Sequence, residues 1–492
     1  MRASAIPPMS GPARNVLLAL LLSVTLAVFA ESGPRDLVIL HINDTHGYLF
    51  APPADEDDSS GDKDKAVPSD EGGAARLATL VRRIREENPD KVLFVHAGDD
   101  LSSDEPITIY HGGEATVQVM NALGLDAMTP GNGEFYGGLD RVLPLRAKAQ
   151  YVMLAANLAY RESGGEVFQP WTVREVNGVR IGILGLGFIR TEHPASQPLS
   201  LGDPVDTAKA YIPLLRSKAD LVLLLTHVGE GEDMRIAAEV PGVDIIIGGH
   251  THTCMDPPRR VKGPDGREVV VAQAGEFYRF LGRLDVAVAT GQDDASRAEV
   301  QGRLIPVDRS VPEDAETSAL LQGYLGPLEE VICVADEDIN YARAGDSPIA
   351  QWAGAAIQRV AATDVVLLSR SDVCNGLTAG PVTLADLVRL NPWRNRIVIA
   401  ELTAAEIEGL LASGKLMGVG CRLDKEGGKS AGLSIGNEKC GPDQRLRVAV
   451  TDYLHATTPE LKDAPATVSD LRVDLILQEH AKQTKHLSAP KP

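Results

Sequence analysis

Side chains that can bind metal ions recur along the first half of the chain, each shortly after a hydrophobic run. Asp44 and His46 follow the apolar segment 37–40, and Asp99 follows the apolar segment 92–95. Carboxylates, amides and imidazoles are all ligands for divalent transition metals. A carboxylate shared by two such metal ions would hold them close together. Two adjacent metal ions can bind the oxygens of one phosphate group. The candidate ligands are Asp44, His46, Asp99, Asn132, His227, His250 and His252.

A single motif of this kind is weak evidence for metal binding. The set as a whole is stronger evidence, because every motif lies at the end of a predicted strand. An Asp-x-His after a strand is usually a turn or a polar pair. The segment 248–252, Gly-Gly-His-Thr-His, is more specific, because glycines let the backbone pass close to an ion. Ligands in open α/β folds gather at the carboxyl ends of strands. The sequence therefore predicts a site for two divalent ions, and Zn, Mn and Fe all suit these ligands.

The segments that carry these residues alternate between strand and helix patterns. Further strands are predicted at 179–186 and 269–273, and amphipathic helices at 76–87 and 114–123. This alternation indicates an α/β sandwich with the ligands on connecting loops. Prolines and charges near 303–316 predict a domain boundary. Beyond it, helices at 315–331, 350–360 and 404–412 and strands at 364–368 and 397–402 indicate an α+β domain, and residues 481–492 are expected to be a disordered tail.

The first residues predict export. Arg2 and Arg14 precede the apolar stretch 16–29, and small residues near Ala30 suit cleavage, so residues 1–30 are interpreted as a signal peptide. The alternative is a membrane anchor, which the short apolar stretch disfavours. No other run is long and apolar enough to cross a bilayer. We expect a periplasmic or secreted protein.

The composition disfavours some classes of binding partner. The formal net charge of −20 disfavours nucleic-acid polymers and anionic lipid surfaces. It does not exclude a small phosphorylated substrate, because bound cations would dominate the local field. Five cysteines leave at least one free thiol, and Cys421 and Cys440 flank a polar, glycine-rich segment. Those two are the best candidates for a disulfide, with five reduced cysteines as the alternative.

The motifs resemble the calcineurin-like metallophosphoesterases, and the whole chain is similar to secreted bacterial 5'-nucleotidases. The matching stretches are 40–46, 72–76, 97–99, 131–132, 226–227 and 247–252, within a resemblance that spans residues 36–460. It implies a four-layer α/β/β/α sandwich over residues 31–306, followed by a smaller α+β 5'-nucleotidase-type domain over 307–480. It also implies a ligand assignment: Asp44, His46 and His252 hold one ion, Asn132, His227 and His250 hold the other, and Asp99 bridges them.

The chain departs from this family beside the second ion. The family usually has Gly-Asn-His-Glu-Phe-Asp where residues 131–136 read Gly-Asn-Gly-Glu-Phe-Tyr. Gly133 thus replaces the histidine that assists the transition state, and Tyr136 replaces the aspartate that orients that histidine. Losing such a group typically costs roughly 10²- to 10⁴-fold in rate. His96 and His111 are candidate substitutes by nearness in sequence only, and packing roles are the alternative for each.

The second domain departs from the family as well. The Asn-Gly-Gly-Gly-Ile-Arg segment of the family is Ser-Arg-Ser-Asp-Val-Cys at 369–374, so Arg370 is the nearest available cation. Trp393 matches one of the two aromatic rings that clamp the base. The segment that would carry the other ring is replaced by 455–459. A stacking ring contributes roughly 1–3 kcal/mol per base, so base recognition loses support.

Two functions are compatible with this sequence. The first is an exported, dimetal-dependent phosphoesterase that hydrolyses a nucleotide or a related small phosphate ester by attack of metal-bound hydroxide. The second is a catalytically impaired relative that keeps its metal and binds a phosphorylated ligand or a protein partner. The seven ligands favour the first function, and the changes at Gly133 and Tyr136 favour the second. The sequence leaves the substrate, the metals and the oligomeric state open.

Overall fold

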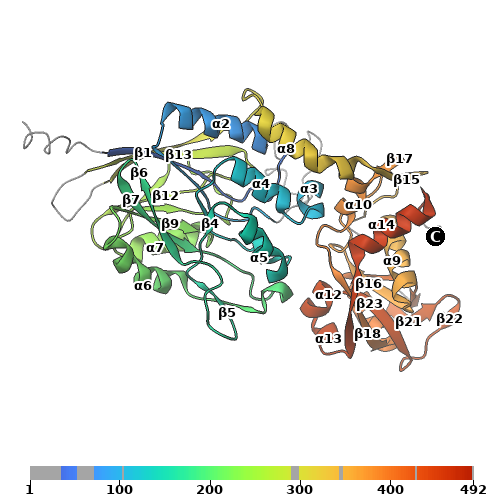
Figure 1. Ribbon diagram of the computed structural model, residues 1–492. Helices are drawn as coiled ribbons and strands as arrows, with labels where there is room; N and C mark the ends of the chain where they lie inside the picture. The colour runs from blue at the N-terminus through green and yellow to red at the C-terminus, as the bar shows by residue number, and fades with distance from the viewer. Residues whose placement is uncertain are drawn as a thin grey trace, which may run out of the picture.

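A computed structural model describes residues 35–51, 71–101, 105–289, 298–342, 347–426 and 429–489. The proposed signal peptide lies outside these ranges, as do residues 54–70 of the acidic stretch 54–71, which the sequence predicts to be a solvated loop. Among the described residues, no helix combines the length and apolarity that a membrane crossing requires. Figure 1 shows two bodies, one built from the blue-to-yellow part of the chain and the other from the orange-to-red part.

The first domain is built on two six-stranded sheets. One has the order β14-β13-β1-β2-β3-β4, in which β1 to β4 run parallel and β13 runs antiparallel to both of its neighbours, β1 and β14. Its strands are β1 (Arg35–Ile42), β2 (Val92–His96), β3 (Ala127–Met128), β4 (Val152–Met153), β13 (Phe280–Val288) and β14 (Ala298–Pro306). The other sheet has the order β11-β12-β10-β9-β7-β6. Its strands are β6 (Trp171–Val176), β7 (Val179–Leu186), β9 (Leu221–Thr226), β10 (Ile245–Ile247), β11 (Arg259–Lys262) and β12 (Glu268–Ala272).

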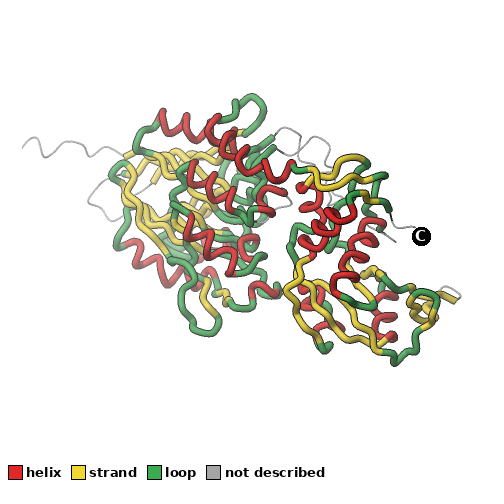
Figure 2. The backbone as a smooth tube through the Cα atoms, turned by 45° about the vertical axis from the view of Figure 1, so that its right-hand side comes forward, coloured by secondary structure: helices red, strands yellow, loops and turns green. Residues whose placement is uncertain are grey.

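The alternation of side chains along each strand divides the apolar residues among three cores. Leu37 and Ile39 of β1 pack between the two sheets, whereas Val38 and Leu40 face a separate core with the helices of the first sheet. In β9, Leu223 points between the sheets and Leu224 points to the helices of the second sheet. Since successive side chains of a strand point to opposite faces, both sheets are buried on both sides. Figure 2 shows these strands stacked between helices.

Helices cover the outer face of each sheet and complete the four layers. The first sheet is covered by α2 (Ala74–Glu87), α3 (Pro106–Tyr110), α4 (Glu114–Ala122) and α5 (Leu139–Lys148). The second is covered by α6 (Pro204–Arg216) and α7 (Glu230–Glu239). Short elements complete the domain: η2 (Gly133–Phe135), η3 (Pro194–Ser196) and a two-stranded ribbon of β5 (Leu158–Tyr160) and β8 (Leu199–Leu201). The expected four-layer α/β/β/α sandwich is confirmed.

The second domain is an α+β unit around a five-stranded sheet of order β19-β16-β23-β18-β24. These strands are β16 (Val365–Ser369), β18 (Arg396–Thr403), β19 (Leu416–Val419), β23 (Arg445–Thr451) and β24 (Ala466–Arg472). One face packs on α9 (Pro348–Ala361) and α14 (Val473–Thr484), and the other on α11 (Ala404–Ala412) and α12 (Asp452–Thr457). The remaining elements are α10 (Leu384–Leu390), α13 (Pro459–Lys462), β15 (Val331–Ala335), β17 (Gly380–Thr383), β20 (Arg422–Glu426), β21 (Lys429–Ile435), β22 (Glu438–Lys439) and β25 (His486–Leu487).

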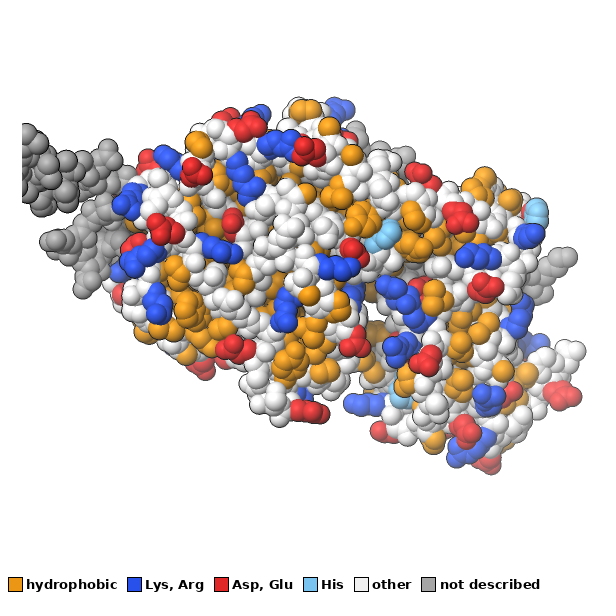
Figure 3. All heavy atoms as spheres, viewed as in Figure 1, with side chains coloured by type: hydrophobic (Ala, Val, Ile, Leu, Met, Phe, Trp, Pro, Cys, Tyr) orange, Lys and Arg blue, Asp and Glu red, His pale blue; other side chains and the backbone are white. Residues whose placement is uncertain are grey.

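The helix after the expected boundary packs on the first domain. It is α8 (Ala315–Leu325), followed by η4 (Gly326–Glu329), and it runs along the top of Figure 1 toward the second domain. Leu321 and Leu328 are buried in the same core as α2 and α4. Figure 3 shows a notch between the two domains on the face viewed, bordered by Lys and Arg side chains.

Two expectations about the second domain need correction. The tail expected to be disordered from residue 481 is ordered through residue 489, because α14 continues to Thr484 and β25 pairs in parallel with β15. The disulfide between Cys421 and Cys440 is absent, since both thiols are free. Burial raises the pKa of the Cys421 thiol to about 11, and the neighbouring Cys440 thiol adds to this increase.

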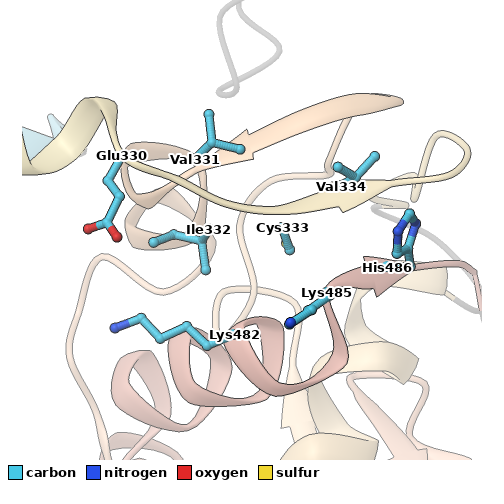
Figure 4. Close-up of a pocket in the computed structure, with 8 residues that line it drawn as sticks. All are labelled: Glu330, Val331, Ile332, Cys333, Val334, Lys482, Lys485 and His486. Carbon is cyan, nitrogen blue, oxygen red and sulfur yellow. The ribbon is translucent and has the colours of Figure 1, made fainter.

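A surface pocket lies between β15 and the end of α14 (Figure 4). It includes no residue that the sequence singled out for metal or substrate binding. The residues that line it are Glu330, Val331, Ile332, Cys333, Val334, Lys482, Lys485 and His486.

Candidate metal centre

Every predicted metal ligand follows the carboxyl end of a strand, and both sheets of the first domain contribute. The first sheet supplies ligands after β1, β2 and β3, and the second supplies ligands after β9 and β10. Because the two sheets stack face to face, their carboxyl ends bring these loops together at one edge. The residues from the first sheet are Asp44, His46, Asp99 and Asn132, and those from the second are His227, His250 and His252.

The side chains meet in two groups of potential ligands. Asp44, His46 and His252 form one group and Asp99, His227 and His250 form the other, with ligand atoms within 4.8 Å of one another in each group. Asp99 Oδ2 lies 3.4 Å from His227 Nε2 and 4.0 Å from His46 Nε2, so the carboxylate reaches both groups. Asp44 is also close to both, with Oδ1 3.4 Å from His252 Nε2 and 3.8 Å from His227 Nε2.

Hydrogen bonds fix the orientation of two of the imidazoles. His227 Nδ1 lies 2.6 Å from the carbonyl oxygen of Ala97, and His252 Nδ1 contacts the Glu276 carboxylate. Since these oxygens only accept, each Nδ1 carries a proton, and each Nε2 becomes the metal-binding atom when it loses its own proton. The Nε2 atoms of His46 and His252 are hydrogen-bonded to each other at 3.1 Å, so one of them donates when no ion is bound. A cation that displaced this proton would have both nitrogens as ligands.

The Asn132 amide is held through its nitrogen, which leaves the oxygen available. Its Nδ2 donates to the Tyr136 hydroxyl at 2.9 Å, whereas its buried Oδ1 makes no hydrogen bond. His227 Nε2 is likewise buried without a hydrogen bond. Buried polar atoms are nearly always paired, so two orphans in one small volume are unusual. A metal ion would satisfy both atoms.

The backbone around the centre adopts conformations that non-glycine residues rarely occupy. Five of the ligands have positive φ angles: Asp44, His46, Asp99, His250 and His252. Such strain costs on the order of 1–3 kcal/mol per residue and clusters at functional sites. Two glycines allow the close packing that holds these loops. A Cβ on Gly131 would lie 2.5 Å from His227 Nε2, and one on Gly249 would lie 2.8 Å from His227 Nδ1.

Glu134 clamps the loop that carries Asp99. Its fully buried carboxylate accepts hydrogen bonds from the backbone N–H groups of Asp99, Asp100, Leu101 and Gly131, at 2.6–3.1 Å. This explains why Glu134 is present although its neighbour in the motif is Gly133. The glutamate shapes the bridging loop, and that task does not depend on a histidine at residue 133.

Without metal ions, the pKa values of the ligands show that the carboxylates of the centre favour positive charge on the imidazoles. Burial opposes the charge on His227, but the carboxylates of Asp99 and Asp44 prevail and raise its pKa to about 10. Burial likewise opposes the charge on His252, and Asp44 and Glu276 raise its pKa to about 10. Burial opposes the charge on Asp44 and Asp99, but His227 and His252 lower the pKa of Asp44, and His227 and His46 lower that of Asp99. Divalent cations would take the place of the imidazole protons.

The imidazoles proposed as substitutes at Gly133 serve other purposes. His96 is fully buried and bonded through both nitrogens, to the Gly98 N–H and to Thr45. His111 Nε2 bonds to the Tyr324 carbonyl at 2.9 Å, where α3 meets α8. These contacts give both histidines packing roles, and neither of them replaces the missing histidine.

The structure places two residues near Gly133 that the sequence did not indicate. His193 and Arg190 lie on the loop after β7, and the His193 ring is 5.0 Å from the Tyr136 ring. Burial raises the pKa of Tyr136, and the positive charge of Arg190 opposes that increase. Both residues follow a strand end, as the metal ligands do, so searching every strand end for cations would have found them.

The substrate candidates of the second domain share one corner. The Trp393 indole N–H donates to the Ser371 carbonyl at 3.0 Å, which places the ring beside the turn that carries Arg370. Trp393 is 46% exposed. Tyr453, at the start of α12, is 41% exposed, and its ring lies 5.7 Å from that of His193. An aromatic ring of the second domain therefore reaches the edge of the metal centre.

Comparisons with known proteins match both halves of the chain. Residues 37–254 match the model of the calcineurin-like phosphoesterases, and residues 330–483 match that of the 5'-nucleotidase C-terminal domain. A 5'-nucleotidase of Vibrio vulnificus is 25% identical over 92% of each chain. Mouse 5'-nucleotidase is 34% identical over 61% of this chain, which spans 54% of the length of that relative. The crystal structure of a 5'-nucleotidase precursor from Thermus thermophilus superposes with a TM-score of 0.64, at 24% identity over 93% of this chain and 98% of that one.

Proposed function

This chain belongs to the calcineurin-like phosphoesterases that carry a 5'-nucleotidase C-terminal domain, and from that premise we propose that it is a metal-dependent phosphoric ester hydrolase. The observation that carries the proposal is the convergence of Asp99 on both groups of ligands, beside the orphaned Asn132 Oδ1 and His227 Nε2. This donor set of imidazoles, carboxylates and one amide fits two divalent transition-metal ions.

We assign the ligands of the ions residue by residue. Bound ions would supply Lewis-acid charge that activates water and neutralises a phosphoryl group. The chain supplies the geometry, because Ala97 and Glu276 fix the protonated nitrogens of His227 and His252. Tyr136 holds the amide nitrogen of Asn132, so the buried amide oxygen is left as a potential ligand. Asp44, His46 and His252 would hold one ion, Asn132, His227 and His250 the other, and Asp99 both.

We further propose a nucleotide, or a related small phosphate ester, as the substrate. The support is the 5'-nucleotidase C-terminal domain and the exposed Trp393, beside which Arg370 stands on the same turn. An exposed indole offers a stacking face for a base. Burial of the substrate between the two domains would place its phosphate at the metal centre, because Tyr453 of the second domain contacts His193 of the first.

A second candidate function rests on Gly133. Among the described residues, no imidazole occupies the place of the missing histidine, and His193 packs on Tyr136 rather than on a metal ligand. Intact metal ligands without the catalytic histidine are what we expect of a protein that binds metal and a phosphorylated ligand but turns it over slowly. Such a protein would retain phosphate affinity and lose rate.

One experiment separates the two functions. The mature protein is loaded with Zn, Mn or Fe, its metal content is measured, and phosphate release is followed from nucleoside monophosphates, sugar phosphates and nitrophenyl phosphate. The hydrolase predicts metal-dependent release that chelation abolishes and metal restores. Full metal occupancy with no release from any ester would contradict the hydrolase and support the binding protein.

We also propose that the protein is exported after removal of residues 1–30. The support is the apolar stretch 16–29 between basic residues and a small-residue cleavage site. N-terminal sequencing of protein recovered from the periplasm or the medium should begin near Glu31. A soluble native preparation that retains Met1 would contradict export.

A further inference from the structure

A fully buried polar cluster connects three of the loops around the metal centre. Its members are Thr45, His96, Asp100 and Tyr278, which are at most 1% exposed. Asp100 Oδ1 accepts from the Thr45 hydroxyl and, at 3.2 Å, from the Tyr278 hydroxyl. Thr45 Oγ1 also lies 3.2 Å from His96 Nε2. None of the four is a proposed metal ligand, and we call them the Asp100 cluster.

The hydrogen bonds of the Asp100 cluster run in one consistent direction. The Gly98 N–H donates to His96 Nδ1 at 3.0 Å, so the neutral ring carries its proton on Nε2. His96 Nε2 therefore donates to the Thr45 hydroxyl, and that hydroxyl donates its own hydrogen to Asp100. Asp100 Oδ1 is thus the acceptor at the end of the chain, and it also receives Tyr278.

Two members of the cluster are next to metal ligands in the chain. Thr45 stands between Asp44 and His46, and Asp100 follows the bridging Asp99. The main chain joins the same two loops, because the His46 N–H donates to the Asp99 carbonyl at 2.8 Å. The hydrogen bond between Thr45 and Asp100 adds a side-chain link beside this one. Asp100 therefore holds the first ligand loop against the loop of the bridge.

Tyr278 extends the cluster to the loop after β12. Glu276, two residues earlier, contacts the ligand His252. Phe277 and Tyr278 have φ angles of 55° and 59°, which bulky side chains rarely adopt. Backbone in such a conformation persists where the surroundings hold it. The hydrogen bond from the Tyr278 hydroxyl to Asp100 anchors the end of this segment, and so supports the residue that orients His252.

We propose that Asp100 is a positioning residue, which raises the ion affinity of the metal centre by holding Thr45 and Tyr278 through one carboxylate oxygen. The inference rests on the metal binding of the proposed function. Ligands that are already held in place lose little conformational freedom when an ion binds. Removal of a partner that orients metal ligands typically weakens metal binding about 10- to 100-fold.

The first test removes one hydroxyl. The Zn affinity of the full-length mature protein is measured by chelator competition, well below the melting temperature. Tyr278→Phe should weaken Zn binding about 3- to 10-fold, because one buried hydrogen bond to Asp100 is lost and the ring stays in the core. Tyr151→Phe is the matched control. Tyr151 is 6% exposed in the same core, its hydroxyl makes no hydrogen bond with the described residues, and its loss should leave Zn affinity unchanged.

The second test changes the acceptor. Asp100→Ala should weaken Zn binding about 10- to 100-fold. Asp100→Asn should recover most of the affinity, because it keeps one oxygen acceptor and the Oδ2 atom that it replaces makes no hydrogen bond. If the Tyr278 hydroxyl acts through Asp100, Tyr278→Phe should weaken binding no further in a protein that already carries Asp100→Ala.

Thermal unfolding of the metal-free proteins separates positioning from stability. Lower melting temperatures for Tyr278→Phe and Asp100→Ala, with full Zn affinity in the folded variants, would show a purely structural role and overturn the inference. Equal Zn affinity in Tyr278→Phe and Tyr151→Phe would overturn it even if Asp100→Ala fails to fold.

The proposed hydrolase can fail separately from this inference. Zn affinity that depends on Asp100 and Tyr278, in a protein that hydrolyses no phosphate ester, would contradict the hydrolase and support the positioning role. Hydrolysis by a protein whose Zn affinity is unaffected by both substitutions would do the reverse. An unaltered protein that binds no Zn would overturn the positioning role as well.

Discussion

Asp99 joins the two halves of the metal centre at the scale of single residues. Its Oδ2 approaches His227 and His46, while its Oδ1 accepts the Gly133 N–H at 2.6 Å. The positive φ of Asp99 and the Glu134 clamp hold the carboxylate in this position. Two groups of ligands that share one carboxylate should gain or lose their ions together.

Replacement of the bridge should therefore empty both sites. Asp99→Ala should reduce the metal content of the purified protein from about two ions per chain to well below one, because neither group keeps a full set of ligands. Elemental analysis on a folded sample is the measurement, with Asp140→Ala, an exposed residue of α5, as the control. Retention of two ions by Asp99→Ala would show that the bridge is elsewhere.

The raised pKa values at the centre predict how metal affinity depends on pH. Without ions, His227 and His252 have pKa values of about 10, so both imidazoles are positively charged at neutral pH, with a proton on Nε2 as well as on Nδ1. An ion must displace these protons, and its affinity should rise with pH up to about 10 and fall as the pH decreases. Chelator competition between pH 6 and 9, combined with calorimetry in buffers of different ionisation enthalpy, measures the affinity and the protons released. An affinity that does not change over this range would refute the prediction.

The elements of the first domain position the site through strand ends and the short turns after them. Ligands at 44, 99 and 132 follow three adjacent parallel strands, and those at 227 and 250 follow two adjacent strands of the other sheet. The turn of η2 contributes the Asn132 ligand and the Glu134 clamp from one short segment. A substitution that changes the conformation of that segment should therefore lower both the free energy of unfolding and the metal affinity.

Removal of the Glu134 carboxylate tests this coupling. Glu134→Ala leaves four buried backbone N–H groups without an acceptor, and each such group costs roughly 1–3 kcal/mol. We expect the free energy of unfolding to fall by at least about 2 kcal/mol and metal binding to weaken. Glu134→Gln keeps one oxygen acceptor and should be destabilised less. Thermal unfolding of the metal-free proteins is the measurement, and equal melting temperatures for all three would contradict the clamp.

Sequence patterns identified the elements that obey simple periodicity and missed contacts that depend on the tertiary fold. The ligands were found because each follows an apolar strand, and β7 and α11 were predicted at their observed ends. Arg190 and His193 follow the end of β7 but belong to no metal-ligand motif, and the contact of the His193 ring with Tyr136 depends on the tertiary fold. The pairing of β25 with β15 was missed because two residues form no pattern. The direction in which α8 packs also cannot be read from its apolar residues alone.

At the scale of the whole molecule, the site depends on how the two domains are joined. Arg394 of the second domain donates to the Ile109 carbonyl at 3.4 Å, and α10 packs against α3. Tyr453 contacts His193 beside the metal centre. The connecting helix α8 packs on α2 and α4, so it is a rigid part of the first domain rather than a free linker.

This packing predicts where the first domain can be cut. A fragment of residues 31–329 keeps α8 and η4, whereas a fragment of residues 31–306 removes Leu321 and Leu328, which are 1% and 2% exposed. Full burial of a leucine side chain contributes roughly 1.5–3 kcal/mol, and the shorter fragment would also expose the apolar faces of α2 and α4. We expect the longer fragment to unfold cooperatively and to bind metal. The shorter one should melt at a lower temperature, bind an apolar dye and aggregate.

Leu321→Asp in the full chain provides the matched test, because it should lower the melting temperature of the first domain. Leu475→Asp, at an exposed position of α14, should not lower it. Equal stability of the two fragments would place α8 with the second domain, as its position in the sequence suggested.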